Sequence, residues 1–126
     1  MTPEGNNELR RQPVKMLTTI VNRGMGETVT DLFRSAGILY HMILLGRGTA
    51  NSDLLSYLGL DETEKDVVLS VVRAGQVEEA LTLLREELEF DKPGHGIALT
   101  IPIGSVGGAR AYEYISSQWV REEEAE

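Results

Sequence analysis

Residues 91–104 read Asp91-Lys92-Pro93-Gly94-His95-Gly96-Ile97-Ala98-Leu99-Thr100-Ile101-Pro102-Ile103-Gly104, a glycine-rich turn that runs directly into an apolar strand. Glycines let the backbone approach a ligand closely, and successive N–H groups in such a turn can bind an anion. The same spacing also fits a tight helix-to-strand connection that binds nothing. An amphipathic helix over residues 76–90 is predicted before the turn. Its apolar face consists of Val77, Ala80, Leu81, Leu84 and Leu88.

Three further strands and one further helix are predicted upstream of this turn. Side-chain alternation predicts a strand over residues 15–22, and nearly unbroken apolar runs predict strands over residues 38–45 and 65–74. A helix from about Glu27 is predicted to end at Gly37. Its apolar face holds Val29, Leu32, Phe33 and Ala36. With the strand over residues 97–103, this order predicts an α+β, ferredoxin-like βαββαβ fold: an antiparallel four-stranded sheet with two helices on one face.

The middle two strands are apolar on both faces. In the strand over residues 38–45, Tyr40, Met42 and Leu44 alternate with other apolar residues, and the strand over residues 65–74 is similar. A sheet that is covered on one face only should alternate apolar and polar side chains. Two helices cover one face, so the pattern predicts that a second copy of the chain covers the other.

Composition narrows the classes of function. The 126 residues include 41% hydrophobic and 25% charged residues, and the net charge is −8. An acidic chain without a basic cluster disfavours nucleic-acid binding. The absence of cysteine excludes disulfides and thiolate metal sites. No apolar run long enough to cross a bilayer and no secretion signal is visible, so we expect a cytoplasmic protein.

The chain is predicted to contain one domain over residues 14–108. Residues 1–13 are predicted to form a disordered tail, and residues 109–126 a C-terminal extension with an acidic end, whose pattern fits a helix or a strand. The long connection over residues 46–64 is predicted to contain a short helix over residues 54–58.

Residues 15–108 resemble the PII-like signalling proteins, in a divergent branch of the nitrogen regulatory PII superfamily. The resemblance rests on the order of elements, on Leu45-Gly46-Arg47-Gly48 at the start of the long connection, and on Gly94-His95-Gly96 before the last strand. It implies a homotrimer that binds a small anionic effector between subunits. ATP, ADP and AMP are candidate effectors. It also implies that the loop after the second strand docks a protein target in nitrogen or carbon metabolism.

The resemblance also indicates which residues bind the effector: Gly46, Arg47, Gly48, Lys92, Gly94, His95, Gly96 and Arg110. In the family, a Gly-Asp-Gly-Lys loop and arginines after the fourth strand hold the phosphates. Here His95 stands at the acidic position and Ile97 at the lysine. We therefore expect weaker ATP binding than in members that keep the lysine. The loop tyrosine that the family modifies has one counterpart here, Tyr57, for which we expect a packing role.

Several residues keep two interpretations. Arg47 fits a forked donor to an anion or a solvated loop residue, and His95 fits an anion contact or an exposed side chain. His41 is expected to be a satisfied core or interface histidine. No catalytic triad, carboxylate pair or phosphate-binding P-loop stands out, so no enzyme is predicted and no catalytic or metal-binding residue is assigned. A ligand-free structural trimer and a metal-binding protein of the same fold are the alternatives.

Overall fold

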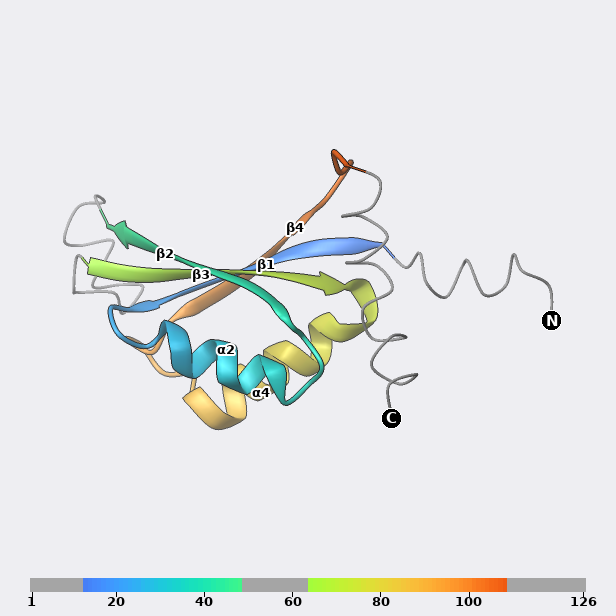
Figure 1. Cartoon of the computed structure of the whole chain (residues 1–126). Coiled ribbons are helices and arrows are strands. Elements are labelled where there is room, and N and C mark those ends of the chain that lie inside the picture. The colour runs from blue at the N-terminus through green and yellow to red at the C-terminus, as the bar shows by residue number, and fades with distance from the viewer. Residues whose placement is uncertain (1–12, 49–63, 109–126) are drawn as a thin grey trace.

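The computed structural model describes residues 13–48 and 64–108. The elements in order are β1 (Val14–Asn22), α2 (Gly26–Arg34), β2 (Tyr40–Arg47), β3 (Glu64–Arg73), the 3-10 helix η1 (Ala74–Gln76), α4 (Val77–Leu88) and β4 (Ile97–Pro102). The strands form one antiparallel sheet in the order β2-β3-β1-β4. Both helices lie on the same face of the sheet (Figure 1). The predicted α+β, ferredoxin-like fold is confirmed.

The hydrophobic core lies between the two helices and the sheet face that they cover. Phe33 of α2 and Leu84 of α4 are almost fully buried there, as the helical periodicity of each segment predicts. From the sheet, Leu17 and Val21 of β1 and Val68 of β3 meet them. Burial of such side chains stabilises the fold by about 1.5–3 kcal/mol each.

The opposite face of the sheet is apolar, and no element of the described residues covers it (Figure 1). Paired residues of antiparallel strands share a face, so the register assigns its members. They are Met16, Thr18, Ile20, Tyr40, Met42, Leu44, Val67, Leu69, Val71, Ile97, Leu99 and Ile101. We call this set the open face. Met42 is 60% exposed, Ile101 49% and Leu99 44%, which is unusual for side chains of this kind in one contiguous surface.

The helix ends differ in how well the sequence predicts them. Gly37 adopts φ +79°, a conformation that glycine reaches without strain, and follows α2 as predicted. In contrast, α4 ends at Leu88 although the apolar pattern runs to residue 90. Glu89 takes the left-handed conformation with φ +54°, and the Phe90 N–H donates to the Leu84 carbonyl.

Part of the sequence-based prediction lies outside the described residues: the tail over residues 1–12, the short helix over 54–58 with Tyr57, and the extension that carries Arg110. The division into a domain over residues 14–108 and an extension stays a prediction. Neither α2 nor α4 has the length and apolar character needed to cross a lipid bilayer.

Candidate functional site

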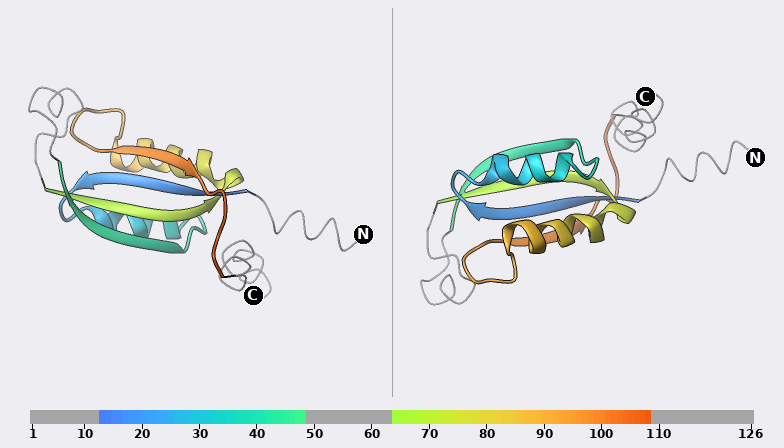
Figure 2. Two further views of the ribbon diagram at one scale, coloured as in Figure 1. Left: turned by 90° about the horizontal axis from the view of Figure 1, so that it is seen from above. Right: turned by 90° about the horizontal axis from the view of Figure 1, so that it is seen from below.

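Both glycine motifs of the sequence lie at the same end of the sheet. The register pairs Arg47 with Glu64 at the end of β2, and Ile97 with Ile20 at the start of β4 (Figure 2). β2 and β4 are nevertheless the two edge strands, three inter-strand steps apart. At about 4.8 Å per step the separation is roughly 14 Å. Within one chain, a small anion at either motif does not reach the other.

The loop over residues 91–96 is fixed partly by its own packing. Gly94 has φ +89° and Gly96 has φ +139°. A Cβ on Gly96 would lie 2.7 Å from Cζ of Phe90 and 2.9 Å from the carbonyl oxygen of Ile20. Gly96 is therefore required by contacts within the chain itself. These contacts fit the tight helix-to-strand connection, one of the two interpretations that the motif left open.

Two polar side chains of this loop are engaged within the loop region. Nδ1–H of His95 donates to the Leu88 carbonyl at 3.1 Å, so the ring satisfies an acceptor at the C-terminus of α4. Nζ of Lys92 lies 3.0 Å from Oε1 of Glu89, and this hydrogen bond lowers the pKa of the Glu89 carboxyl. Because the Lys92–Glu89 pair is exposed, it is weak, and Lys92 can be recruited by a stronger anion.

At the other motif, the backbone and side chain have different environments. The Gly46 carbonyl accepts a hydrogen bond from Nη2 of Arg23 at 2.9 Å, and a Cβ on Gly46 would lie 3.2 Å from Cγ2 of Val67. The Arg47 side chain is exposed and makes no hydrogen bond or ion pair with any residue of 13–48 or 64–108. Arg47 is thus a free cation in the described part of the chain. Gly48 is the last residue described before the gap.

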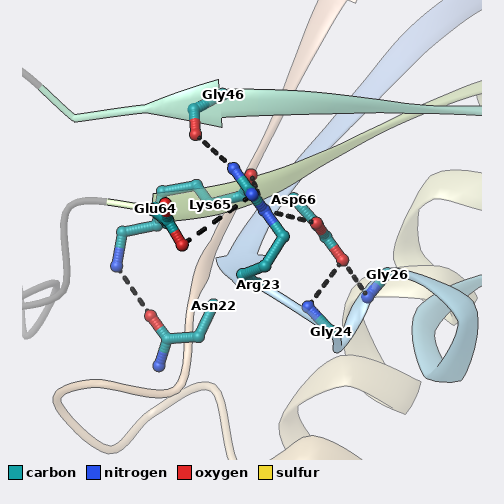
Figure 3. A network of polar contacts seen from close by, with 8 residues as sticks. All are labelled: Asn22, Arg23, Gly24, Gly26, Gly46, Glu64, Lys65 and Asp66. Carbon is teal, nitrogen blue, oxygen red and sulfur yellow. Dashed lines mark hydrogen bonds and ion pairs between the residues drawn. The ribbon is translucent and has the colours of Figure 1, made fainter.

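Between the two motifs lies a polar network that the sequence analysis missed (Figure 3). Its centre is Asp66, whose side chain is 7% exposed. Oδ2 of Asp66 accepts from the N–H groups of Gly24 and Gly26 at 2.9 and 3.0 Å, and Oδ1 lies 3.2 Å from Nε of Arg23. Met25, at the N-cap of α2, has no capping side chain. Asp66 supplies that cap from a neighbouring strand, where the helix dipole favours a carboxylate.

The network extends in both directions along the sheet end. Nε of Arg23 donates to the Lys65 carbonyl at 3.2 Å, while Nη2 of the same side chain donates to the Gly46 carbonyl. Nζ of Lys65 donates to Oδ1 of Asn22 at 2.6 Å, and Nδ2 of Asn22 donates to the Gly94 carbonyl at 3.4 Å. The available sequence signal was the adjacent charged pair Lys65-Asp66 directly before the apolar run of β3, since buried charges require partners.

The half-buried His41 ring lies beside the core and is satisfied by hydrogen bonds, as its position in the strand predicted. Its Nε2 donates to the Ile38 carbonyl at 2.8 Å, Nδ1 lies 3.0 Å from Oγ of Ser70, and the ring stacks on Phe33. Burial lowers the pKa of His41 and outweighs the opposing effect of the Ile38 carbonyl. Within the described ranges, no three side chains of the metal-binding kinds come together.

Known proteins were compared with the chain on sequence and on structure. No family model matches the sequence, and no curated protein matches it. Solved structures do match it in fold, among them the following three. Apo CPII from Thiomonas intermedia K12, a nitrogen regulatory PII-like protein, has a TM-score of 0.53 at 21% identity over 72% of this chain and 89% of its own. Arabidopsis thaliana PII bound to citrate has a TM-score of 0.58 at 19% identity, and the match covers 79% of this chain and 82% of that chain. CPII from Thiomonas intermedia K12 bound to ADP, AMP and acetate has a TM-score of 0.56 at 20% identity, and the match covers 75% of this chain and 91% of that chain.

This chain has the PII-like fold. In that fold the position at which the resemblance places a phosphate-binding lysine is Ile97, the first residue of β4. Ile97 pairs with Ile20, so its side chain belongs to the open face. Ile97 therefore extends the uncovered apolar surface toward the 91–96 loop.

Proposed function

We propose that this chain is a cytoplasmic, non-enzymatic PII-like signalling protein. It assembles as a homotrimer, binds a small anionic effector between subunits and regulates a protein target in nitrogen or carbon metabolism. One observation carries the proposal: the two glycine motifs share one end of a sheet whose open face is apolar. The PII-like fold supports the same function, although a fold by itself hosts many functions.

Assembly is supported by the energetics of the open face. Met42, Leu99 and Ile101 are each about half exposed in the single chain, and they neighbour further apolar side chains on the same surface. Contiguous apolar surfaces of this kind mark protein interfaces in soluble proteins. A closed ring of three copies would cover the open face of each chain with those of its neighbours.

A site between subunits is supported by the separation of the motifs. Arg47 ends one edge strand and the 91–96 loop precedes the other, so a ligand as small as citrate contacts both only if they come from different chains. Arg47 is free to bind it, and Lys92 is held only by an exposed pair. One structural neighbour is bound to ADP and AMP and another to citrate, and all three ligands are small anions. We infer an effector that carries phosphate or carboxylate groups.

Calorimetric titration of the full chain with ATP, ADP, AMP, citrate, bicarbonate and 2-oxoglutarate tests this function. We expect at least one adenine nucleotide or carboxylate to bind. Arg47→Ala should weaken that ligand by roughly 1.5–3 kcal/mol, about tenfold or more, if the contact is a charge-assisted hydrogen bond. Arg34→Ala is the matched control, because Arg34 is exposed on α2 and pairs only with Asp31 in the described residues. Equal losses for both variants would contradict a role for Arg47.

The replaced lysine gives a second test of the same site. Ile97→Lys should strengthen ATP binding, since the lysine would add an ammonium–phosphate contact. If ATP already binds tightly and the lysine adds nothing, Lys92 or Arg110 supplies the missing cation.

A ligand-free structural trimer is the second candidate. The contacts of Gly96 with Phe90 and Ile20, and of His95 with Leu88, favour it because they explain the loop without a ligand. A trimer that binds none of the titrated compounds would support this candidate. It would also exclude these compounds as effectors.

A further inference from the structure

Asn22 occupies a position that only a side-chain amide satisfies. On one side its Oδ1 lies 2.6 Å from the Lys65 ammonium, which can only donate, and on the other its Nδ2 lies 3.4 Å from the Gly94 carbonyl, which can only accept. The two partners therefore fix the orientation of the amide. Lys65 belongs to β3 and Gly94 to the 91–96 loop, and the two residues are 29 positions apart in the sequence.

Lys65 depends on this contact. The residue is only 4% exposed, and Asn22 is the acceptor of its ammonium among the described residues. A buried ammonium without an acceptor is costly, so the Lys65 side chain holds the Asn22 amide in place. The short Lys65–Asn22 distance and the long Asn22–Gly94 distance indicate that the first contact is the stronger one.

The same strand end is tied to β2 through Arg23. The Arg23 guanidinium donates to the carbonyls of Lys65 and Gly46, and Asp66 forms an ion pair with the same Nε that donates to Lys65. A path of polar contacts therefore runs from Gly46 at the end of β2, through Arg23 and Lys65, to Asn22 at the end of β1 (Figure 3). The Asn22 amide continues it to the Gly94 carbonyl of the 91–96 loop.

We propose that Asn22 is a positioning residue that couples the 91–96 loop energetically to the ends of β2 and β3. When the Gly94 carbonyl is displaced, the Asn22 amide loses one of its two partners and the Lys65 side chain is held less firmly. When Lys65 is lost, the amide is free to rotate and the loop loses its anchor. The coupling acts in both directions, as any linkage between two positions must. The relevance to an effector rests on the function proposed above, but the coupling itself does not.

Hydrogen exchange of the full chain, followed at residues 94–97 and at residues 46 and 64–66, tests the coupling. Lys65→Met should accelerate exchange at residues 94–97 about fivefold. The substituted residue lies on β3, but without its ammonium the Asn22 amide no longer holds the Gly94 carbonyl. Lys15→Met is the matched control: it makes the same change on β1, where Lys15 pairs with Val72 and Pro102 at the opposite end of the sheet. It should leave exchange at residues 94–97 unchanged.

A substitution at Asn22 itself separates its two contacts. Asn22→Asp keeps an acceptor for Lys65 but replaces the donor to Gly94 with a second acceptor. We expect faster exchange at residues 94–97 with little change at residues 64–66, whereas Asn22→Ala should accelerate both. Unchanged exchange at residues 94–97 in Lys65→Met and in Asn22→Asp would overturn the proposal.

Titration with ADP connects the coupling to the effector. If wild-type protein binds ADP, Lys65→Met should weaken it several-fold, and ADP should slow exchange at residues 64–66 in wild type but not in Asn22→Ala. ADP binding without either effect would contradict the coupling. If no ligand of the calorimetric panel binds, the proposed function fails, and the exchange measurements on unliganded protein still decide the coupling.

Discussion

Asp66, a residue of β3, caps the N-terminus of the helix α2. Its carboxylate accepts hydrogen bonds from two N–H groups at the start of α2 and pairs with Arg23, and it is almost fully buried. A Cβ on Gly26 would lie 2.9 Å from Oδ2 of Asp66, so the glycine is what admits the carboxylate. The helix start is therefore determined jointly by residues 40 positions apart.

We predict that Asp66→Asn lowers the free energy of unfolding by about 1–3 kcal/mol, because the amide loses the charge and leaves one N–H without a good acceptor. Urea unfolding measures the change. The control is Asp31→Asn: Asp31 pairs with Arg34 at the surface with 73% of its side chain exposed, and its loss should cost under about 0.5 kcal/mol. Similar effects for both variants would contradict the capping role.

His41 gives a pH dependence whose sign follows from its environment. Its pKa is lowered below the ordinary value of 6.5 by burial, and Arg34 contributes in the same direction. Below pH 6.5 the unfolded chain therefore takes up a proton that the folded chain resists. The stability associated with neutral His41 is present above that pH and is lost as the pH falls through the folded pKa.

We predict that the free energy of unfolding falls between about pH 7 and pH 5.5 in wild type, and that His41→Gln reduces this slope. Urea unfolding at several pH values provides the comparison. His95→Gln serves as the control, because His95 is exposed. An identical slope in wild type and His41→Gln would mean that His41 does not titrate differently on folding.

At the scale of elements, the strands and helices follow from local patterns, but the loop connecting α4 to β4 does not. Side-chain alternation, unbroken apolar runs and period-3.6 spacing located the four strands and two helices of the described residues within a few residues of their bounds. No local signal showed that Glu89 would adopt φ +54°, or that Gly96 would be enclosed by Phe90 and Ile20. Those features depend on contacts between segments that only the folded chain brings together.

We predict that Gly96→Ala destabilises the fold by about 1–3 kcal/mol, since the added Cβ meets both Phe90 and the Ile20 carbonyl at a φ of +139°. Gly104→Ala is the matched control, because a Cβ there has nothing within 4 Å. Thermal unfolding compares the two. Equal stability would show that the loop has room for a Cβ at Gly96. Close approach of a ligand would then be the better explanation for that glycine.

At the scale of the whole molecule, the open face is the feature that sequence and structure describe most consistently. Apolar residues on both faces of the middle strands predicted an uncovered surface, and Met42, Leu99 and Ile101 are exposed on it. The candidate site was only partly predictable. The sequence identified both glycine motifs, but the network of Asn22, Lys65 and Asp66 between them required the register of three strands, which no single segment encodes.

Leu99→Glu should prevent assembly without unfolding the chain, because it places a charge on the β4 edge of the open face that neighbouring copies would bury. Light scattering at micromolar concentration should give a mass near that of one chain, 13.9 kDa, with an unchanged circular dichroism spectrum. Arg85→Glu, an exposed charge change on α4, should leave assembly as in wild type. If Leu99→Glu assembles like wild type, the open face is not the interface.

Native mass spectrometry of the full chain with ADP tests the central claim most directly, since it reads assembly and ligand stoichiometry together. The proposed function predicts a species of three chains, about 42 kDa from 13.9 kDa each, that carries up to three ADP molecules, one for each equivalent subunit boundary. A single chain that binds ADP would contradict a site formed between subunits. A single chain without ADP would contradict both the assembly and the site.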